Sequence, residues 1–133
     1  LRRVIEVGTV SVICGKLNEA DFTGLEALNS KLEYQNGLEV CVQADRDFHI
    51  KLMNYVQNPL VSQIEKMIYQ TRSVLLYKIM CYKDVVEDAY ADHIKIIEAL
   101  KSEDRCRCVE AMMSHLDDVS QNIDRLGIHV EHI

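Results

Sequence analysis

Residues that interrupt helices are scarce in this sequence. Its 133 residues include one proline and five glycines, and these fall between long segments in which apolar residues recur three and four positions apart. Strand-like alternation, internal repeats and low-complexity stretches are absent. The pattern predicts an all-α fold in a single domain, residues 1–133, built as an antiparallel bundle of about six helices.

Long hydrophobic runs and an excess of basic residues are also missing. No stretch approaches the roughly 20 apolar residues that a membrane span requires, and the first residues lack the pattern of a signal peptide. The formal net charge is −6, which disfavours binding to nucleic-acid phosphates because that binding depends on lysine and arginine. We therefore expect a cytoplasmic protein that does not bind membranes and does not bind DNA through these residues.

The five cysteines give no disulfide framework. Their number is odd and they are dispersed among helical segments, which indicates a reducing compartment. Cys106 and Cys108 are two positions apart, so on a helix their side chains point in nearly opposite directions and cannot both ligate one ion from a regular turn.

Local capping signals predict where the helices begin and end. Asn18 and Asn58 are expected N-caps, the second followed by Pro59 in the first turn, and Ser102 is expected to cap the last helix. The predicted helices cover residues 1–14, 19 to the Asn36-Gly37 pair, 38–56, 59–82, 84–101 and 103–126.

Four residues form a candidate metal site. Asp45 and His49 are four positions apart and therefore lie on one face of a helix. His93 and His115 each lie in a later helix on or beside its apolar face. Buried ionisable groups cost a few kcal/mol each unless they are satisfied. One carboxylate and three imidazoles are a suitable ligand set for Zn²⁺, Ni²⁺, Mn²⁺ or Fe²⁺ and can leave a position open.

Other interpretations of these residues remain open. Each histidine could be a hydrogen-bonded core residue and Asp45 part of a solvated face, which would make the chain a metal-free helical dimerisation module. Alternatively, a three-histidine site could serve a metal-dependent hydrolase or transferase, with Asp47 or Asp92 as the general base. His129 and His132 follow the last predicted helix, and we interpret them as tail residues.

The order of five motifs resembles a known family. The motifs are LRRVIE, DRDFH, NPLVSQI, DHIKIIEAL and CVEAMMSHL. Together they cover nearly the whole chain and are similar to the C-terminal effector-binding domain, called the FCD domain, of the FadR-type branch of the GntR transcription regulators. The resemblance implies a helical sensor domain with a central metal/ligand cavity, rather than an enzyme.

The resemblance also implies roles for individual residues. Asp45, His49, His93 and His115 match the metal ligands of metal-binding members, so we expect one divalent transition metal, with Zn²⁺ the first choice and Ni²⁺, Mn²⁺ or Fe²⁺ as alternatives. The metal would help to hold a small carboxylate effector, with an arginine supplying charge-assisted hydrogen bonds. The candidates for that arginine are Arg2 and Arg72.

The family further implies a homodimer and a second domain. In such regulators a winged helix-turn-helix domain normally precedes the effector-binding domain, and this sequence does not contain one. Leu1 already has the sequence context of a helix interior. We therefore expect that the chain begins partway through a longer protein, and that DNA is contacted only through the N-terminal domain.

Overall fold

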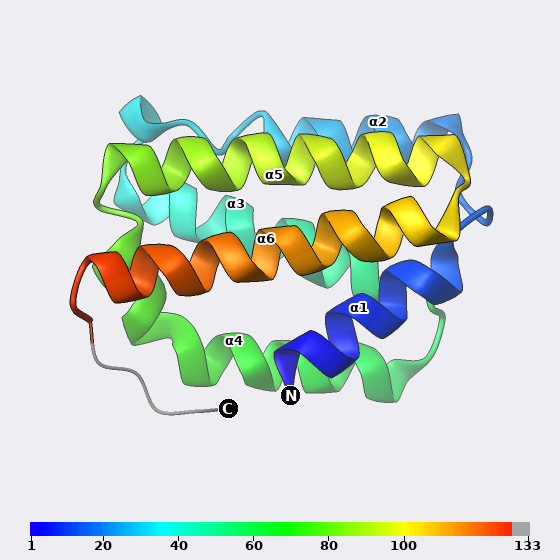
Figure 1. The fold of residues 1–133 in the computed structure, drawn as a ribbon, viewed down its shortest axis with the longest axis horizontal. Coiled ribbons are helices and arrows are strands. Elements are labelled where there is room, and N and C mark those ends of the chain that lie inside the picture. The colour runs from blue at the N-terminus through cyan, green and yellow to red at the C-terminus, as the bar shows by residue number, and fades with distance from the viewer. Residues whose placement is uncertain (129–133) are drawn as a thin grey trace.

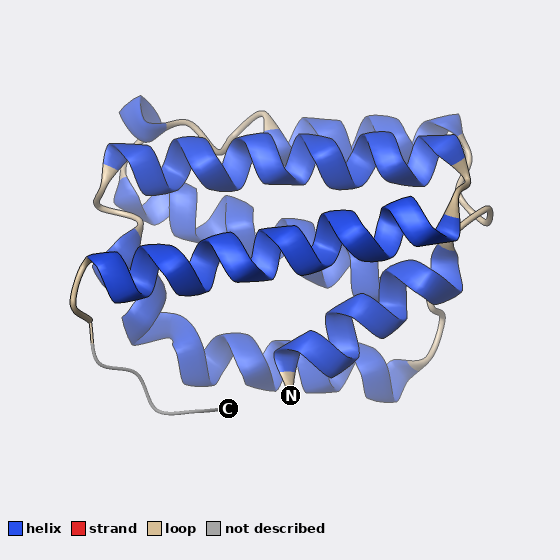
Figure 2. Cartoon of the chain, viewed as in Figure 1, coloured by secondary structure: helices blue, strands red, loops and turns tan. Residues whose placement is uncertain are grey.

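The computed structural model describes residues 1–128, which form a helical bundle (Figure 1). Its elements are α1 (Arg2–Ile13), α2 (Glu19–Asn29), the 3₁₀ helix η1 (Tyr34–Asn36), α3 (Leu38–Asn54), α4 (Pro59–Ile79), α5 (Lys83–Ser102) and α6 (Arg105–Arg125). Within residues 1–128 there is no strand (Figure 2). The predicted all-α bundle of about six helices is confirmed, whereas His129 and His132 lie outside the described residues.

The helices pack so that distant parts of the chain become neighbours. The most extensive contact is between α5 and α6, which run side by side (Figure 1), and α1 packs mainly on α6. α3 packs on α4, and α2 packs on both α3 and α5. None of the helices in the described part of the chain is both long enough and apolar enough to cross a bilayer.

The core consists of two apolar clusters. One contains Phe48 of α3, Ile96 of α5 and Met112 of α6. The other contains Ala44 of α3 and Ala89 of α5, together with residues of α4 and α6. On α3 and α5, the residues of one cluster end and those of the other begin near the predicted metal ligands. Polar side chains therefore separate the two halves of the core.

Two predicted caps are confirmed. The side chain of Asn18 accepts a hydrogen bond from the backbone N–H of Asp21, and the Asp21 side chain accepts one from the Asn18 N–H. Asn58 accepts a hydrogen bond from the Leu60 N–H at the start of α4. Each cap satisfies backbone donors that the first turn of a helix leaves free.

The predicted end of the second helix was wrong. α2 ends at Asn29, and the short helix η1 occupies the residues just before Gly37. Leu32 is buried between the two, with 1% exposure, and belongs to the second core cluster. The chain leaves the axis of α2 to bury Leu32, and Gly37, with φ of 96°, ends η1 instead.

The predicted cap of the last helix was also wrong. Ser102 belongs to α5, where its hydroxyl donates to the backbone oxygen of Ala99. Glu103 then takes a left-handed conformation with φ of 58°. Asp104 caps α6 by accepting a hydrogen bond from the Arg107 N–H.

Candidate metal centre

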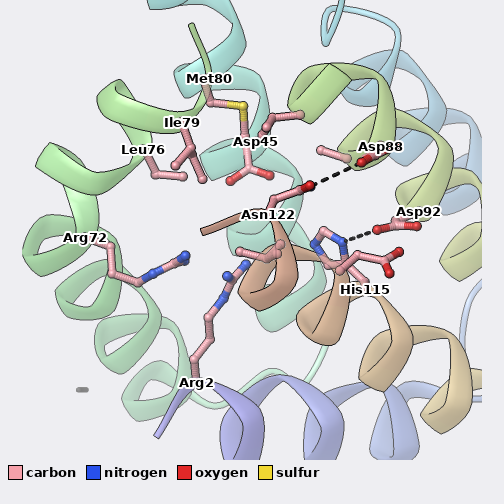
Figure 3. Close-up of a pocket in the computed structure, with 14 residues that line it drawn as sticks. Arg2, Asp45, Arg72, Leu76, Ile79, Met80, Asp88, Asp92, His115 and Asn122 are labelled. Carbon is pink, nitrogen blue, oxygen red and sulfur yellow. Dashed lines mark hydrogen bonds and ion pairs between the residues drawn. The ribbon is translucent and has the colours of Figure 1, made fainter. Parts of the chain in front are cut away.

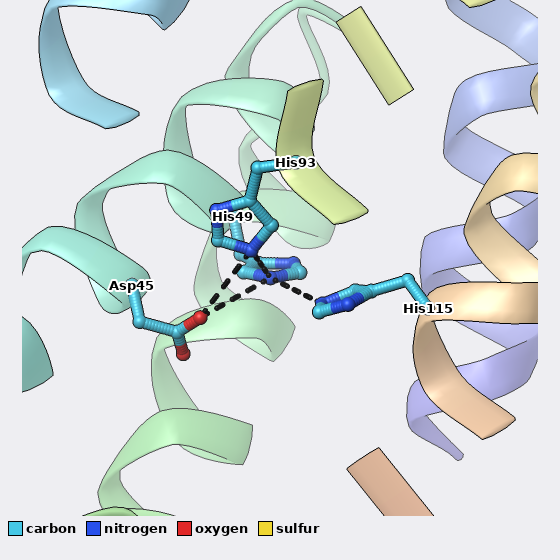
Figure 4. Close-up of side chains that lie close together, drawn as sticks. All are labelled: Asp45, His49, His93 and His115. Atoms are coloured by element: carbon cyan, nitrogen blue, oxygen red, sulfur yellow. Dashed lines mark hydrogen bonds and ion pairs between the residues drawn. The ribbon is translucent and has the colours of Figure 1, made fainter. Parts of the chain in front are cut away.

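Three helices bring the four predicted ligands together. Asp45 and His49 come from α3, His93 from α5 and His115 from α6 (Figure 4). All four are buried, and their candidate ligand atoms lie within 4.8 Å of one another. The Nε2 atom of His49 is 3.2 Å from the Nε2 atoms of both His93 and His115, and Asp45 Oδ1 is 3.4 Å from His93 Nε2.

Packing fixes the plane of one of these rings. Phe48, which directly precedes His49, stacks on the His93 ring with 4.0 Å between centroids and 6° between planes. Phe48 and His93 are both 0% exposed. The same turn of α3 therefore supplies ligands on one side and an aromatic support for His93 on the other.

The outward nitrogen of each imidazole faces an oxygen acceptor. Nδ1 of His115 is 3.1 Å from Oδ2 of Asp92, and Nδ1 of His49 bonds to Oε1 of Glu6. Arg2 and His49 together lower the pKa of Glu6 to about 2, although burial opposes its ionisation. A carboxylate that cannot donate fixes the proton of its histidine partner on Nδ1.

Asn29 provides the acceptor that fixes the proton of His93 on Nδ1. The amide nitrogen of Asn29 donates to the backbone oxygen of Tyr90, with 3.2 Å between the atoms. Its oxygen is therefore left to accept from Nδ1 of His93 at 2.9 Å. All three imidazoles thus donate outward from Nδ1 and direct the lone pair of Nε2 toward a common point.

This donor set fits a divalent metal. Two nitrogens bound at about 2.1 Å to one ion are roughly 3.0 to 3.4 Å apart for octahedral to tetrahedral angles, and the two Nε2 separations of 3.2 Å fall in that range. Burial lowers the pKa of His93 to about 4 and that of His115 well below its usual value. Both rings are therefore neutral at physiological pH, as metal ligation requires.

The carboxylate of Asp45 is held in the ionised form. Burial raises its pKa, but the neighbouring His93, His49 and Arg2 outweigh burial and hold the pKa below its usual range. The hydroxyl of Tyr69 donates to Asp45 Oδ2, with 3.3 Å between the oxygens. One carboxylate oxygen is thereby oriented while the other faces the histidines.

Several residues that support this site were missed by the sequence reasoning. Glu6 is 0% exposed and lies on the same buried face of α1 as Thr9, Val10 and Ile13. An acidic residue in register with an apolar stripe was a signal that could have identified it. Asn29 and Tyr69 carried no comparable signal, because their roles depend on which helices meet.

A small pocket adjoins the ligands (Figure 3). It has a volume of about 20 Å³ and is lined by Asp45, His115, Arg2 and Arg72 together with apolar side chains. Arg2 forms an ion pair with Glu6, and its Nη2 atom lies 3.5 Å from Nε2 of His49. The structure therefore brings both predicted effector-binding arginines to one pocket beside the four ligands.

Two charged groups in this region lack the hydrogen bonds that their burial demands. Nη1 of Arg72 has no partner, and neither carboxylate oxygen of Glu65 has one. Burial and the nearby Glu6 raise the pKa of Glu65 to about 7. Unsatisfied buried polar groups are costly and are therefore informative about ligand binding or protonation.

The two aspartates considered as general bases have other contacts. Asp47 accepts a hydrogen bond from Gln43 on the outer side of α3, with 2.7 Å between the atoms. Asp92 bonds to the Nδ1 side of His115 rather than to the side that faces the other ligands. Asp92 therefore orients a histidine, and neither residue is placed to activate a water on the Nε2 side.

The fold and the site define a class of all-α domains in which a buried cluster of histidines and a carboxylate lies beside a small pocket. The chain belongs to the FCD domain family, whose family model matches residues 1–118. The resemblance inferred from the five motifs is thereby confirmed.

One curated relative provides a further comparison. The chain is 27% identical over 128 residues to the HTH-type transcriptional regulator LutR of Bacillus subtilis (strain 168), a match that covers 90% of this chain and 57% of LutR. The chain thus spans a little over half the length of this relative. A search of solved structures found no match.

Proposed function

We propose that this chain is the effector-sensing domain of a GntR-family transcription regulator. Asp45, His49, His93 and His115 hold one divalent transition metal, and a small carboxylate effector binds beside it. The observation that carries this proposal is the convergence of three imidazoles whose Nδ1 atoms all face oxygen acceptors. Such outer hydrogen bonds typically accompany metal-ligating histidines.

The ligand types favour some divalent metals over others. Three imidazoles and one carboxylate suit Zn²⁺ first, with Ni²⁺, Mn²⁺ and Fe²⁺ as alternatives. When bound, the ion supplies positive charge and an open coordination position for an effector carboxylate. The family match and the separations of the ligand atoms support this assignment.

Arg72 and Arg2 are the residues proposed to bind the effector. Arg72 is 8% exposed and its Nη1 atom has no partner, so a carboxylate in the pocket would satisfy it by a charge-assisted hydrogen bond. Arg2 is already paired with Glu6, which makes it the secondary partner. Both line the pocket beside His115.

The sensing domain is proposed to act within a cytoplasmic homodimer. Leu60, Met67 and Val74 recur every seven residues along α4 and are each at least 63% exposed, which supports a self-complementary helix contact. DNA binding is assigned to a winged helix-turn-helix domain outside these 133 residues. Effector binding would shift the helices and so change the relative positions of the two DNA-binding domains.

Elemental analysis combined with a thermal-shift screen tests this function. The chain, purified without a metal-affinity step, is expected to contain about one transition metal per molecule, and small organic acids are expected to raise its Tm. His93→Ala should abolish both effects, whereas Glu87→Ala, an exposed change on the same helix, should preserve them. Absence of metal after reloading with Zn²⁺, Ni²⁺ or Mn²⁺ would instead favour a metal-free dimerisation module.

A further inference from the structure

The pocket has a second polar wall, which is acidic. Three aspartates of α5 and α6 line it; they are Asp88, Asp92 and Asp118. Asp88 and Asp92 lie on the side away from the two arginines (Figure 3). Apolar side chains complete the lining, including those of Leu76, Ile79, Val85, Ala89 and Val119. The pocket therefore presents guanidinium groups on one side and carboxylates on the other.

The side chains of Asp92 and Asp118 share a hydrogen bond with each other, and the remaining hydrogen-bonding capacity of this acidic wall is available. Asp88 accepts one hydrogen bond from the side-chain amide of Asn122, but a carboxylate can accept about four. In the part of the chain that the structure describes, neither Asp88 nor Asp118 forms an ion pair with a lysine or arginine. Lys95 is the nearby cation that acts on Asp118, and it does not line the pocket.

The opposite wall provides an independent sign of a ligand. Arg72 is only 8% exposed, and the Nη1 atom of its guanidinium has no hydrogen-bond partner. The side chain points into the same pocket (Figure 3). An anionic group would satisfy Arg72 on one side of the pocket. The carboxylates on the other side, among them that of the exposed Asp88, can bind a cation but do not require one.

We propose that the effector is an amino acid, a small molecule with an ammonium group in addition to its carboxylate. The carboxylate binds Arg72, and the ammonium group donates to Asp88 and Asp118. This inference rests on the proposed function and narrows its effector class. The pocket volume of about 20 Å³ corresponds to only about one or two water molecules, so the side chains that line the pocket must move apart to admit even a small amino acid.

Charge balance favours an ammonium group over a hydroxyl group. The pocket lining contains two arginines, Arg2 and Arg72, and four aspartates, the three of the acidic wall and Asp45. With the proposed divalent ion bound, the two arginines and the ion balance the four aspartates, so a simple carboxylic acid or a hydroxy acid leaves one negative charge unbalanced. An amino acid leaves none, and its cationic donor forms stronger hydrogen bonds to carboxylates than a neutral hydroxyl does.

Matched ligand series separate these possibilities. The metal-loaded chain is titrated calorimetrically with alanine, lactate and propanoate, and then with 4-aminobutanoate, 4-hydroxybutanoate and butanoate. Within at least one series the amino member is expected to bind about tenfold or more tightly than the other two, which corresponds to one additional charge-assisted hydrogen bond. Equal or tighter binding of the hydroxy or unsubstituted member in both series overturns the inference.

A double variant identifies the residues responsible. Asp88→Asn with Asp118→Asn keeps the side-chain shape but removes two charges, so the preference for the amino member should fall to about twofold or less. Propanoate affinity should stay the same or rise. Asp117→Asn, an exposed neighbour on α6, serves as the matched control, and circular dichroism verifies the helical content of each variant.

The possible outcomes distinguish this inference from the function on which it rests. Binding of acids without any preference for an ammonium group contradicts the amino acid assignment and leaves the carboxylate sensor intact. A preference that survives the double variant also contradicts the assignment, because the acidic wall then plays no part. If no ligand of either series binds the chain, and Arg72→Met leaves the stability of the ligand-free protein unchanged, the carboxylate sensor and the amino acid assignment both fail.

Discussion

Asp92 accepts a hydrogen bond from His115 across the interface between α5 and α6, with 3.1 Å between Oδ2 and Nδ1. Asp92 directly precedes His93, so a single turn of α5 supplies one candidate ligand and orients another. This arrangement couples the candidate metal centre to the most extensive helix contact in the bundle. A change in the packing of α5 on α6 would therefore also move the donor atoms.

The first prediction concerns this orienting carboxylate. Asp92→Ala should lower metal affinity by about 10-fold to 100-fold, because loss of the outer hydrogen bond frees the ring and its tautomer. Competition against a chromophoric chelator measures the affinity. Asp124→Ala, an exposed change on α6, should leave it unchanged. Full affinity in Asp92→Ala would show that packing alone orients His115.

Local sequence signals predicted much of the fold. Asn18 and Asn58 marked helix starts because capping depends on residues only two or three positions away. The wrong boundaries, at Asn29 and Ser102, have different causes. Burial of Leu32 depends on contacts with distant helices, whereas the α6 start was a choice between two good caps, Ser102 and Asp104.

The candidate site was predictable only in part. Asp45 and His49 share one helix face by spacing alone, but spacing could not show that α3, α5 and α6 meet. That step came from the family resemblance. Partners such as Asn29, which contacts His93 over a separation of 64 residues, arise from tertiary packing and leave no periodic trace in the sequence.

The second prediction concerns removal of the metal. If the metal is present at a thousandfold excess over its Kd, it stabilises the native state by about 4 kcal/mol. For a domain of this size the corresponding loss of Tm on treatment with EDTA is roughly 15 °C. Calorimetric scans before and after chelation, followed by addition of Zn²⁺, measure the change and its reversal. An unchanged Tm would indicate that hydrogen bonds alone satisfy the histidines.

The third prediction is a pH dependence caused by Glu65 in the metal-free protein. Burial raises the pKa of Glu65 from 4.5 to about 7 in the folded state, so between these values the native state binds a proton that the unfolded state has lost. Stability should therefore fall as pH rises from 4.5 through 7, by about 3 kcal/mol for a shift of this size.

Urea unfolding at pH 5 and pH 8 measures this contribution. Glu65→Gln removes the titrating group and should flatten the dependence, whereas the exposed control Glu98→Gln should retain it. If Glu65→Gln loses as much stability between pH 5 and pH 8 as the wild-type chain does, other groups cause the pH dependence.

The fourth prediction concerns thiol reactivity. Cys81 and Cys106 are exposed, whereas Cys41 and Cys108 are buried. Burial raises the pKa of Cys108 to about 12, which further suppresses the reactive thiolate. A thiol reagent at pH 8 should therefore label Cys81 and Cys106 rapidly, and the buried Cys41 and Cys108 only after unfolding. Peptide mass spectrometry measures the labelling of each cysteine. Rapid labelling of Cys108 would contradict the packing of α6.

The last prediction is that replacing Arg72 has opposite effects on stability and on ligand binding. Its buried guanidinium has an unpartnered Nη1 atom, and burial, followed by repulsion from Arg2, lowers its pKa. Methionine has a similar length and no charge, so Arg72→Met should stabilise the ligand-free protein by about 1 to 3 kcal/mol. The same change should abolish stabilisation by organic acids, because it removes the proposed anion contact.

Urea unfolding of the two proteins, with and without an acid that binds the wild-type chain, measures both effects. Lys66→Met, an exposed change on the same helix, should alter neither. A clear loss of ligand-free stability in Arg72→Met would mean that the guanidinium is already satisfied within the fold, and would remove the main support for an anionic ligand. Higher stability together with lost binding would show that this buried charge is retained for recognition, at the expense of the stability of the bundle.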